Sequence, residues 1–268
     1  MKSENELTDP DYWDKNWESA ALPRVVQPWK NPLEGRLARF FRKHLPRGGR
    51  CLEIGCAASP WLPFFARELG YEPWGVDYSA LGLKLAQANM EMQKIPCRFV
   101  FGDFTAVEIP ISSFRMIFSS GVVEHYADPG AIFNKAFDLL EPGGLIVTII
   151  PNIVGFLGMV LKRMNRPIWD VHVPFGPEDM DRLHKKAGFD TILPSHYFGV
   201  FGLGILAWHN VYGRIPKWVR RPLAYTIQYS ERLVGWATWW GDGLLDNRHS
   251  SPYIIGIYKK PASSPITS

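Results

Sequence analysis

Short apolar runs alternate with amphipathic segments along most of this chain. Apolar runs rich in β-branched and aromatic residues predict strands at Cys51–Ile54, Gly75–Ser79, Phe99–Phe104, Met116–Gly121 and Leu140–Ile150, and later at about 189–198 and 252–259. Apolar residues at helical spacing predict helices at 34–44, 60–69, 79–93, 129–140 and 177–187. This alternation predicts an α/β fold with a doubly wound, mostly parallel seven-stranded sheet.

The first predicted strand runs into a turn of small residues that begins at Gly55. Glycine and alanine let the backbone approach a ligand closely, and open α/β sheets bind ligands at the carboxyl ends of their strands, where Glu53 lies. A dinucleotide site usually has Gly-x-Gly-x-x-Gly. Here Ala57 replaces the second glycine, and Glu53 would repel a pyrophosphate. The turn favours a ligand with positive charge, although an ordinary strand-to-helix connection has the same pattern.

Acidic residues also end the second and third predicted strands. Asp77 follows Glu53 by 24 positions, and an acid at about that spacing accepts hydrogen bonds from ribose hydroxyls in dinucleotide folds. Asp103 could accept a hydrogen bond from an exocyclic amine. Phe104 or Tyr78 could flank an adenine ring. The pattern therefore indicates a nucleoside-containing ligand.

Five motifs occur in a fixed order: Leu-Glu-Ile-Gly-Cys, Gly-Val-Asp, Gly-Asp-Phe, Val-Val-Glu-His and Leu-Glu-Pro-Gly-Gly. The series resembles the class I S-adenosylmethionine-dependent methyltransferases over about residues 45–150, and more faintly to Gly188-Phe189. The resemblance implies S-adenosyl-L-methionine as cofactor and S-adenosyl-L-homocysteine as product. It implies that Glu53 and Gly55 lie by the methionine part, that Asp77 holds the ribose hydroxyls, and that Asp103 and Phe104 meet the adenine. The expected cofactor-binding residues are Glu53, Gly55, Cys56, Ala57, Asp77, Tyr78, Asp103, Phe104, Ser120, Trp13 and Trp17. Ala57 and Ser59 depart from the family, which often has glycines there.

Two histidines are candidates for a general base, the role that histidine fills most readily near neutral pH. His172 follows the fifth predicted strand and a short helix, and chain order puts it over the substrate mouth. His125 follows the fourth strand, at the ligand edge of the sheet. His196 and His209 are weaker candidates, and His44, His184 and His249 are expected in the core or on the surface. Asp170 and His172 have no clear third ligand, so no metal site is expected.

Two segments lie outside the minimal sheet. The N-terminal residues 1–30 carry Trp13 and Trp17, four positions apart on one helical face, and are expected to form a helical lid over the cofactor or to pack on the core. An aromatic-rich insertion at 199–250, before the last strand, holds five of the eleven tryptophans and six arginines or lysines. We interpret 151–180 and 199–250 as a substrate-side cap of one domain, 1–268, with a dimer contact or a membrane-surface contact of 199–250 as alternatives. The tail 261–268 is expected to be flexible.

Charge and cysteine content narrow the class of protein. The net charge is +4, and residues 151–268 carry 14 basic and 8 acidic residues against 16 and 18 in residues 1–150. This excess is too diffuse to indicate nucleic-acid binding. The three cysteines have no zinc or redox spacing. With no signal-peptide pattern and no apolar run of about 18 residues, we expect a cytoplasmic protein, with peripheral membrane contact as an alternative.

The function expected from these features is methylation of a small-molecule acceptor, most readily at a hydroxyl, by in-line displacement with a histidine base. The acceptor could be sugar-like, lipid-linked or aromatic. N-methylation of a small molecule is the nearest alternative. A non-catalytic scaffold or membrane-surface protein with the cofactor fold is a further one. A nucleotide-dependent oxidoreductase is disfavoured by the missing glycines, and a nucleic-acid methyltransferase by the lack of an Asn-Pro-Pro-Tyr signature.

Overall fold

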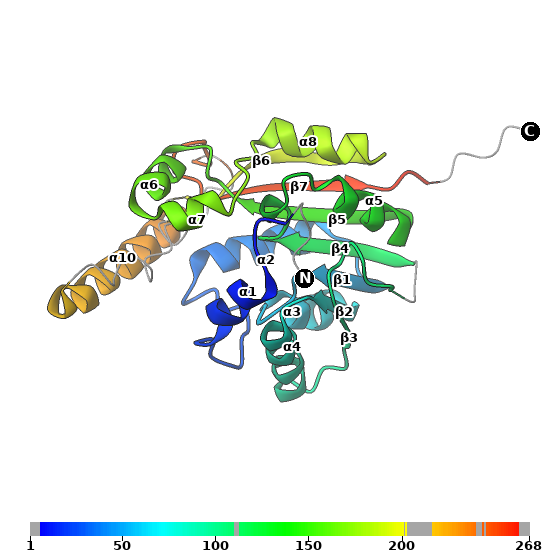
Figure 1. The fold of residues 1–268 in the computed structure, drawn as a ribbon, viewed down its shortest axis with the longest axis horizontal. Coiled ribbons are helices and arrows are strands. Elements are labelled where there is room, and N and C mark those ends of the chain that lie inside the picture. Colours follow the sequence, from blue (N-terminus) through cyan, green and yellow to red (C-terminus); the bar gives the residue numbers. More distant parts are fainter. Residues whose placement is uncertain are drawn as a thin grey trace, which may run out of the picture.

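A seven-stranded sheet forms the centre of the molecule in the computed structural model, which describes residues 6–109, 113–200, 202, 216–239, 243 and 245–262 (Figure 1). The spatial order of the strands is β3-β2-β1-β4-β5-β7-β6. The strands are β1 (Arg50–Ile54), β2 (Glu72–Asp77), β3 (Arg98–Phe101), β4 (Phe114–Ser120), β5 (Leu140–Pro151), β6 (Asp190–Phe198) and β7 (Tyr253–Lys259).

Strands β1 to β5 pair in parallel, and β7 runs antiparallel to both of its neighbours, β5 and β6. The expected mostly parallel, doubly wound sheet is therefore confirmed. The chain leaves β1 toward β2 and β3 on one side and returns to β4 and β5 on the other. The strand order thus reverses between β1 and β4, where open α/β sheets bind their ligands.

Helices cover both faces of the sheet (Figure 1). They are α1 (Pro10–Trp17), α2 (Pro32–His44), α3 (Trp61–Leu69), α4 (Ala80–Met92), α5 (Gly130–Leu139), α6 (Phe156–Met164), α7 (Arg166–Asp170), α8 (Pro177–Lys186) and α10 (Lys217–Ala237), with a 3-10 turn η1 (Val123–His125). One core cluster joins α2 and α3 to the sheet through Phe41 and Phe65, and another joins α5 and α8 to it through Phe133 and Met180. The five helices predicted from residue 34 to residue 187 begin and end within two residues of these bounds.

Local sequence explains where these helices begin and end. The Asn31 side chain accepts a hydrogen bond from the Glu34 backbone N–H at 3.2 Å, and Pro32 is the first residue of α2. Ser79 caps α4 in the same way, accepting from the Gly82 N–H at 2.8 Å. Helix α3 ends at Gly70, whose φ of +72° suits glycine. Because Ser79 follows Asp77 by two positions, the cap of α4 also fixes the end of β2 at the ligand edge.

The N-terminal segment crosses the ligand edge of the sheet. The Leu7 N–H donates to the His125 carbonyl at 2.8 Å. Helix α1 packs on α4, where the Asp14 carboxylate accepts hydrogen bonds from the Ser79 hydroxyl and the Leu81 N–H. The expected N-terminal helix therefore lies beside β2 and η1.

Helix α10 projects away from the sheet (Figure 1). Asp246, which follows this helix, is tied back to α2 by a buried ion pair in which the Arg36 Nη2 atom donates to both Asp246 carboxylate oxygens, each at 3.0 Å. In the part of the chain that the structure describes, no helix is long and apolar enough to cross a membrane. Of the tryptophans and basic residues counted in the 199–250 insertion, Trp208, Arg214 and Trp240 lie outside the described residues, as do the base candidate His209 and the last six residues of the 261–268 tail.

Candidate functional site

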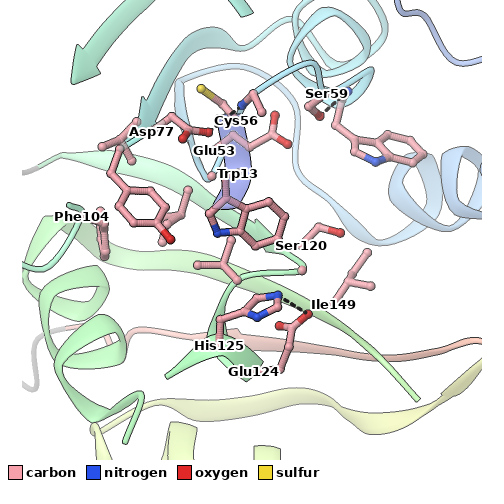
Figure 2. Close-up of a pocket in the computed structure, with 18 of the residues that line it drawn as sticks. Trp13, Glu53, Cys56, Ser59, Asp77, Phe104, Ser120, Glu124, His125 and Ile149 are labelled. Atoms are coloured by element: carbon pink, nitrogen blue, oxygen red, sulfur yellow. Dashed lines mark hydrogen bonds and ion pairs between the residues drawn. The ribbon is translucent and has the colours of Figure 1, made fainter. Parts of the chain in front are cut away.

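A cavity of about 440 Å³ opens at the carboxyl ends of β1, β2 and β4 (Figure 2). Twelve of the thirteen site residues expected from the sequence line it: Trp13, Trp17, Glu53, Gly55, Cys56, Ala57, Asp77, Tyr78, Phe104, Ser120, His125 and His172. Asp103 is the exception. Residues from six separate stretches of sequence thus meet in one space, and the sheet topology is what brings them together.

The turn after β1 forms the floor of the cavity. The N–H groups of Gly55 and Cys56 donate to the Val76 carbonyl at 2.9 and 3.2 Å, so the turn is held against β2. Gly55 has a φ of +69°, and a Cβ there would lie 2.6 Å from a methyl group of Val122. Ala57 also has a positive φ, +21°, which is unusual for a residue with a side chain. The small-residue turn therefore forms with alanine at this position.

Asp77 holds this turn and the start of the next helix together. One carboxylate oxygen accepts from the Ala57 N–H at 2.9 Å and the other from the Ser79 N–H at 2.8 Å. Burial raises the pKa of Asp77 to about 6, and these backbone hydrogen bonds oppose the rise. Each carboxylate oxygen keeps a second lone pair, which can accept from a ligand hydroxyl.

Glu53 is a buried carboxyl group with an unsatisfied oxygen. Its side chain is 3% exposed, and its Oε2 atom has no hydrogen-bond partner among the described residues. Burial raises the pKa of Glu53 to about 8, with the nearby Asp77 adding to the rise and hydrogen bonds from Ser59 and Leu62 opposing it. Figure 2 shows Glu53 facing the cavity beside Cys56. An unpaired buried carboxylate there suits a cationic ligand.

The far wall carries Phe104 and Tyr78. Phe104 is 4% exposed and lines the cavity, whereas the Asp103 carboxylate accepts from the N–H and the hydroxyl of Thr105 at 2.8 and 2.7 Å. The Asp103 carboxylate is thus bonded to its own turn, and the residue is not part of the cavity lining. The structure brings the predicted aromatic residues to the cavity but not the neighbouring acid.

The N-terminal segment supplies the roof. The indole N–H of Trp13 donates to the Thr8 hydroxyl at 3.0 Å, and that hydroxyl lies 3.0 Å from the Tyr78 hydroxyl. The Trp13 ring also meets the His125 ring edge-on, with centroids 5.0 Å apart. These contacts connect α1 to the end of β2 and to η1, over the cavity.

Glu124, His125 and His172 form a cluster on the wall opposite the Gly55 turn. The His125 Nε2 atom lies 3.9 Å from a Glu124 carboxylate oxygen (Figure 2), and the two imidazole rings have centroids 4.4 Å apart. The Nδ1 atom of His125 lies 2.7 Å from the Val171 carbonyl. The Nδ1 atom of His172 lies 2.5 Å from the Ile168 carbonyl. Because a carbonyl only accepts, both Nδ1 atoms carry the hydrogen, and both Nε2 atoms are acceptors in the neutral rings.

Burial sets the charge of these groups. It lowers the pKa of His125 to about 3, an effect that the nearby His172 increases, and it also lowers the pKa of His172. Burial raises the pKa of Glu124 to about 8. The cluster is therefore built from neutral imidazoles beside a carboxyl group that favours its protonated form unless a cation accompanies it.

Several lining residues were not foreseen from the sequence. They include Thr8, Arg24, Glu124, Tyr126 and Tyr253. Glu124 lies in the Val-Val-Glu-His motif, and an acid that directly follows two valines is a usable signal of a buried carboxylate. No local pattern marks Tyr253, which reaches the cavity from β7. His196 and His184 do not line the cavity, and His184 stacks on Tyr258 in the core.

Comparison with known proteins identifies the fold. A family model described as a methyltransferase domain matches residues 29–193. The ubiquinone biosynthesis O-methyltransferase of Caulobacter sp. strain K31 is 28% identical over 213 residues, which are 76% of this chain and 82% of the relative.

Two solved structures show the same architecture. Geranyl diphosphate C-methyltransferase from Streptomyces coelicolor aligns with a TM-score of 0.60 at 12% identity, over 94% of this chain and 97% of that one. Haemonchus contortus phosphoethanolamine N-methyltransferase 2 aligns with a TM-score of 0.57 at 21% identity, over 85% of this chain and 52% of that one. The chain therefore spans about half the length of the nematode enzyme.

The described residues fit S-adenosylmethionine, which carries a sulfonium, an ammonium group and two ribose hydroxyls. Glu53 offers an unpaired carboxylate oxygen for a cationic group, and Gly55, where a Cβ would lie 2.6 Å from a Val122 methyl group, keeps the turn free of a side chain. Asp77 keeps lone pairs for hydroxyls. The family match over more than half of the chain agrees with this chemistry. The protein belongs to the class I S-adenosylmethionine-dependent methyltransferases, and S-adenosylmethionine is its cofactor.

Proposed function

We propose that the enzyme methylates a hydroxyl group of a small molecule, with a histidine as general base. The observation that carries this proposal is the pair of unprotonated Nε2 atoms on the wall of the cofactor cavity. A hydroxyl is a weak nucleophile until its proton leaves, and a positioned base accelerates such a step by about 10²–10⁴-fold.

The backbone carbonyls of residues 168 and 171 prepare both imidazoles for this role. Each accepts the Nδ1 hydrogen of one histidine, which fixes the tautomer and leaves Nε2 free to take a proton. We assign His172 as the base, because it is partly exposed, whereas His125 is 5% exposed. When bound, S-adenosylmethionine supplies the electrophilic methyl group. The protein's own contribution is to hold the acceptor oxygen near His172 and to exclude water.

The lining of the cavity indicates the class of acceptor. Trp17, Trp61 and Tyr253 are aromatic, and Arg24 adds a positive charge. This composition favours an aromatic or otherwise apolar acceptor and tolerates an acidic group on it. The relative from Caulobacter carries an O-methyltransferase name, which supports the choice of oxygen, while its 28% identity leaves the acceptor open. We propose phenolic and similar ring hydroxyls as the first class to test.

The experiment compares matched acceptors that differ only in the reacting atom. Pairs of a phenol and the corresponding aniline are incubated with the enzyme and trideuteromethyl S-adenosylmethionine, and products are detected by mass spectrometry. We expect deuteromethyl ethers of the phenols, formed at least 100-fold more slowly by His172→Ala. The matched control His249→Ala replaces an exposed histidine outside the cavity and should keep full activity. Products from the anilines alone would establish N-methylation instead. Equal methylation rates for His172→Ala and His249→Ala would show that His172 is not the base.

We also propose that α10 rests on an anionic lipid surface. Its exposed large side chains lie three, four or seven positions apart and are 36–80% exposed: Trp218, Tyr225, Tyr229, Leu233 and Trp236. Trp29, which is 79% exposed, stacks on Trp236 and extends this surface. The helix sequence carries four basic residues and one acidic residue, as helices that lie in a headgroup layer do.

Co-sedimentation with vesicles tests the lipid contact. Vesicles containing phosphatidylserine should carry the protein down, and Trp218→Ala with Tyr225→Ala should reduce the bound fraction at least fivefold. Phosphatidylcholine vesicles should bind less. A protein that stays in the supernatant with both lipids, but forms dimers that the same double substitution disrupts, would assign this surface to a second copy of the chain.

A further inference from the structure

We propose that Glu124, His125 and His172 bind one divalent transition-metal cation, which holds the oxygen of the acceptor in the cavity. This inference rests on the proposed function for its acceptor, a hydroxyl group, and gives the activation of that hydroxyl to the cation instead of to His172 whenever the cation is bound. It assigns a ligand to the cluster that the methyltransferase fold itself does not require.

The geometry of the three side chains carries the proposal. One donor atom from each residue lies within 4.8 Å of the other two, and no other such group of three occurs among the described residues. Ligand atoms bound at 2.0–2.2 Å to one cation lie roughly 3–3.6 Å apart. The cluster therefore needs to contract by about 1 Å, which side-chain rotation can supply.

Glu124 provides a second and independent observation. It is 2% exposed, and its Oε2 atom has no hydrogen-bond partner among the described residues. Leaving a carboxylate oxygen buried without a partner is costly, and buried charges are usually paired or bound to a metal. Since the side chain borders the cavity, a cation there would satisfy the oxygen without moving the backbone.

The surroundings of the two histidines are those of metal ligands. A metal-bound imidazole usually donates its other ring N–H to a carbonyl or a carboxylate, which fixes the ring orientation. The carbonyls of Val171 and Ile168 accept the Nδ1 hydrogens in this way, so both Nε2 lone pairs stay available. The Val173 N–H also donates to the Glu124 carbonyl at 2.7 Å, which ties the two parts of the cluster together.

The donor set selects the class of cation. Two imidazoles and one carboxylate are the protein ligands of catalytic zinc sites and of the open iron(II) sites of oxygenases. Three protein ligands leave at least one position free, on the side of the cavity. Zn²⁺, Co²⁺ and Fe²⁺ suit this set better than Mg²⁺ or Ca²⁺, which prefer oxygen ligands.

A cation at this position would change how the hydroxyl is activated. The acceptor oxygen would form a bond to the cation, and its O–H bond would break with the proton leaving to water at the mouth of the cavity. His125 and His172 would then be ligands, and neither would act as a base while the cation is bound. After methylation the oxygen is an ether, a weaker ligand, and the product can leave.

The experiment measures metal binding without using activity. Chelator-treated full-length protein is titrated with Co²⁺, and the visible absorption of the bound ion reports stoichiometry and coordination. We expect one Co²⁺ per chain, displaced by Zn²⁺. Glu124→Gln and His172→Ala should each weaken binding at least 100-fold. The control His249→Ala should bind as the wild type does, and S-adenosylhomocysteine binding by all variants checks that they are folded.

Each outcome bears on one of the two proposals. No Co²⁺ signal in folded wild-type protein, or a signal that Glu124→Gln leaves unchanged, overturns the metal site. Methylation of a phenol at full rate in the presence of a chelator also overturns it and leaves His172 as the base. Stoichiometric Co²⁺ binding by a protein that methylates amines alone would support the metal site and reject O-methylation.

Discussion

Binding of the cofactor product should release a proton from Glu53. In the free protein, burial raises the pKa of Glu53 to about 8 from its ordinary 4.5, so at pH 7 about 0.9 of the molecules carry the proton. A ligand that places its ammonium group beside the unpaired oxygen favours the ionised form. Binding at pH 7 should therefore release about 0.9 proton, and Asp77, with a pKa of about 6, should add only about 0.1.

The same reasoning gives the pH dependence of affinity. Ionising Glu53 at pH 7 costs about 1.4 kcal/mol, so affinity for S-adenosylhomocysteine should rise about tenfold from pH 7 to well above pH 8. The folding stability of the free protein should change with pH in the opposite direction. Because the folded-state pKa of this acid is raised, its contribution to stability is full below about pH 4.5 and is lost as the pH rises to about 8.

Calorimetry in chelator-containing buffers of different ionisation enthalpy measures the released protons directly. The wild type should show a heat that depends on the buffer, and Glu53→Gln should show almost none of that dependence. A wild-type heat that is the same in every buffer would refute the assignment of Glu53 to the cationic part of the cofactor. A dependence that persists in Glu53→Gln would assign the proton to another group.

Three further substitutions test separate parts of the structure. Asp246→Ala should lower the free energy of unfolding by about 3–5 kcal/mol in denaturant titrations, because it leaves the buried Arg36 charge unpaired. Ala57→Gly should raise it by up to about 1 kcal/mol, because glycine adopts the positive φ without strain, and should leave cofactor affinity unchanged. Trp13→Ala should weaken S-adenosylhomocysteine binding about tenfold by calorimetry, since it removes the ring that lies against His125 and lines the cavity.

Matched controls accompany these substitutions. Glu68→Ala breaks the exposed pair with Arg42 and should cost no more than about 1 kcal/mol. Trp29→Ala removes a tryptophan that is 79% exposed and outside the cavity, and should not change cofactor affinity. If Asp246→Ala lowered the free energy of unfolding no more than Glu68→Ala does, the buried ion pair would not anchor the loop after α10. A loss of affinity in Ala57→Gly would mean that the alanine itself contacts the cofactor.

Much of the cofactor side could be predicted from local sequence. Apolar runs that end in Glu53 and Asp77 identify parallel strands, and parallel strands bring their carboxyl ends to one edge of a sheet. The small-residue turn at Gly55 follows from its need for a positive φ and a close approach. These features depend on neighbours in sequence or on the regular geometry of the sheet.

The acceptor side could not be predicted in this way. Glu124 and His172 are 48 positions apart, and they meet because the chain returns from α7 to pair Val173 with Glu124. No spacing rule encodes such a return. Asp103 lies outside the cavity lining, and its carboxylate accepts hydrogen bonds from Thr105, so its contact with the adenine stays a prediction. The substrate-side cap at 199–250 stays a prediction, and none of its described residues lines the cavity.

The central claim is that the cavity bounded by the Gly55 turn and Asp77 holds the cofactor. Calorimetric titration with S-adenosylhomocysteine, of the wild type beside Asp77→Ala and the control Asp190→Ala, tests it most directly. The structure predicts saturable one-to-one binding by the wild type. Asp77→Ala should lose this binding, because the substitution removes the carboxylate that holds the turn and accepts from the ligand hydroxyls. Asp190→Ala, which replaces an exposed residue on β6, should retain it. Folded wild-type protein without binding, or binding that Asp77→Ala leaves intact, would contradict the account.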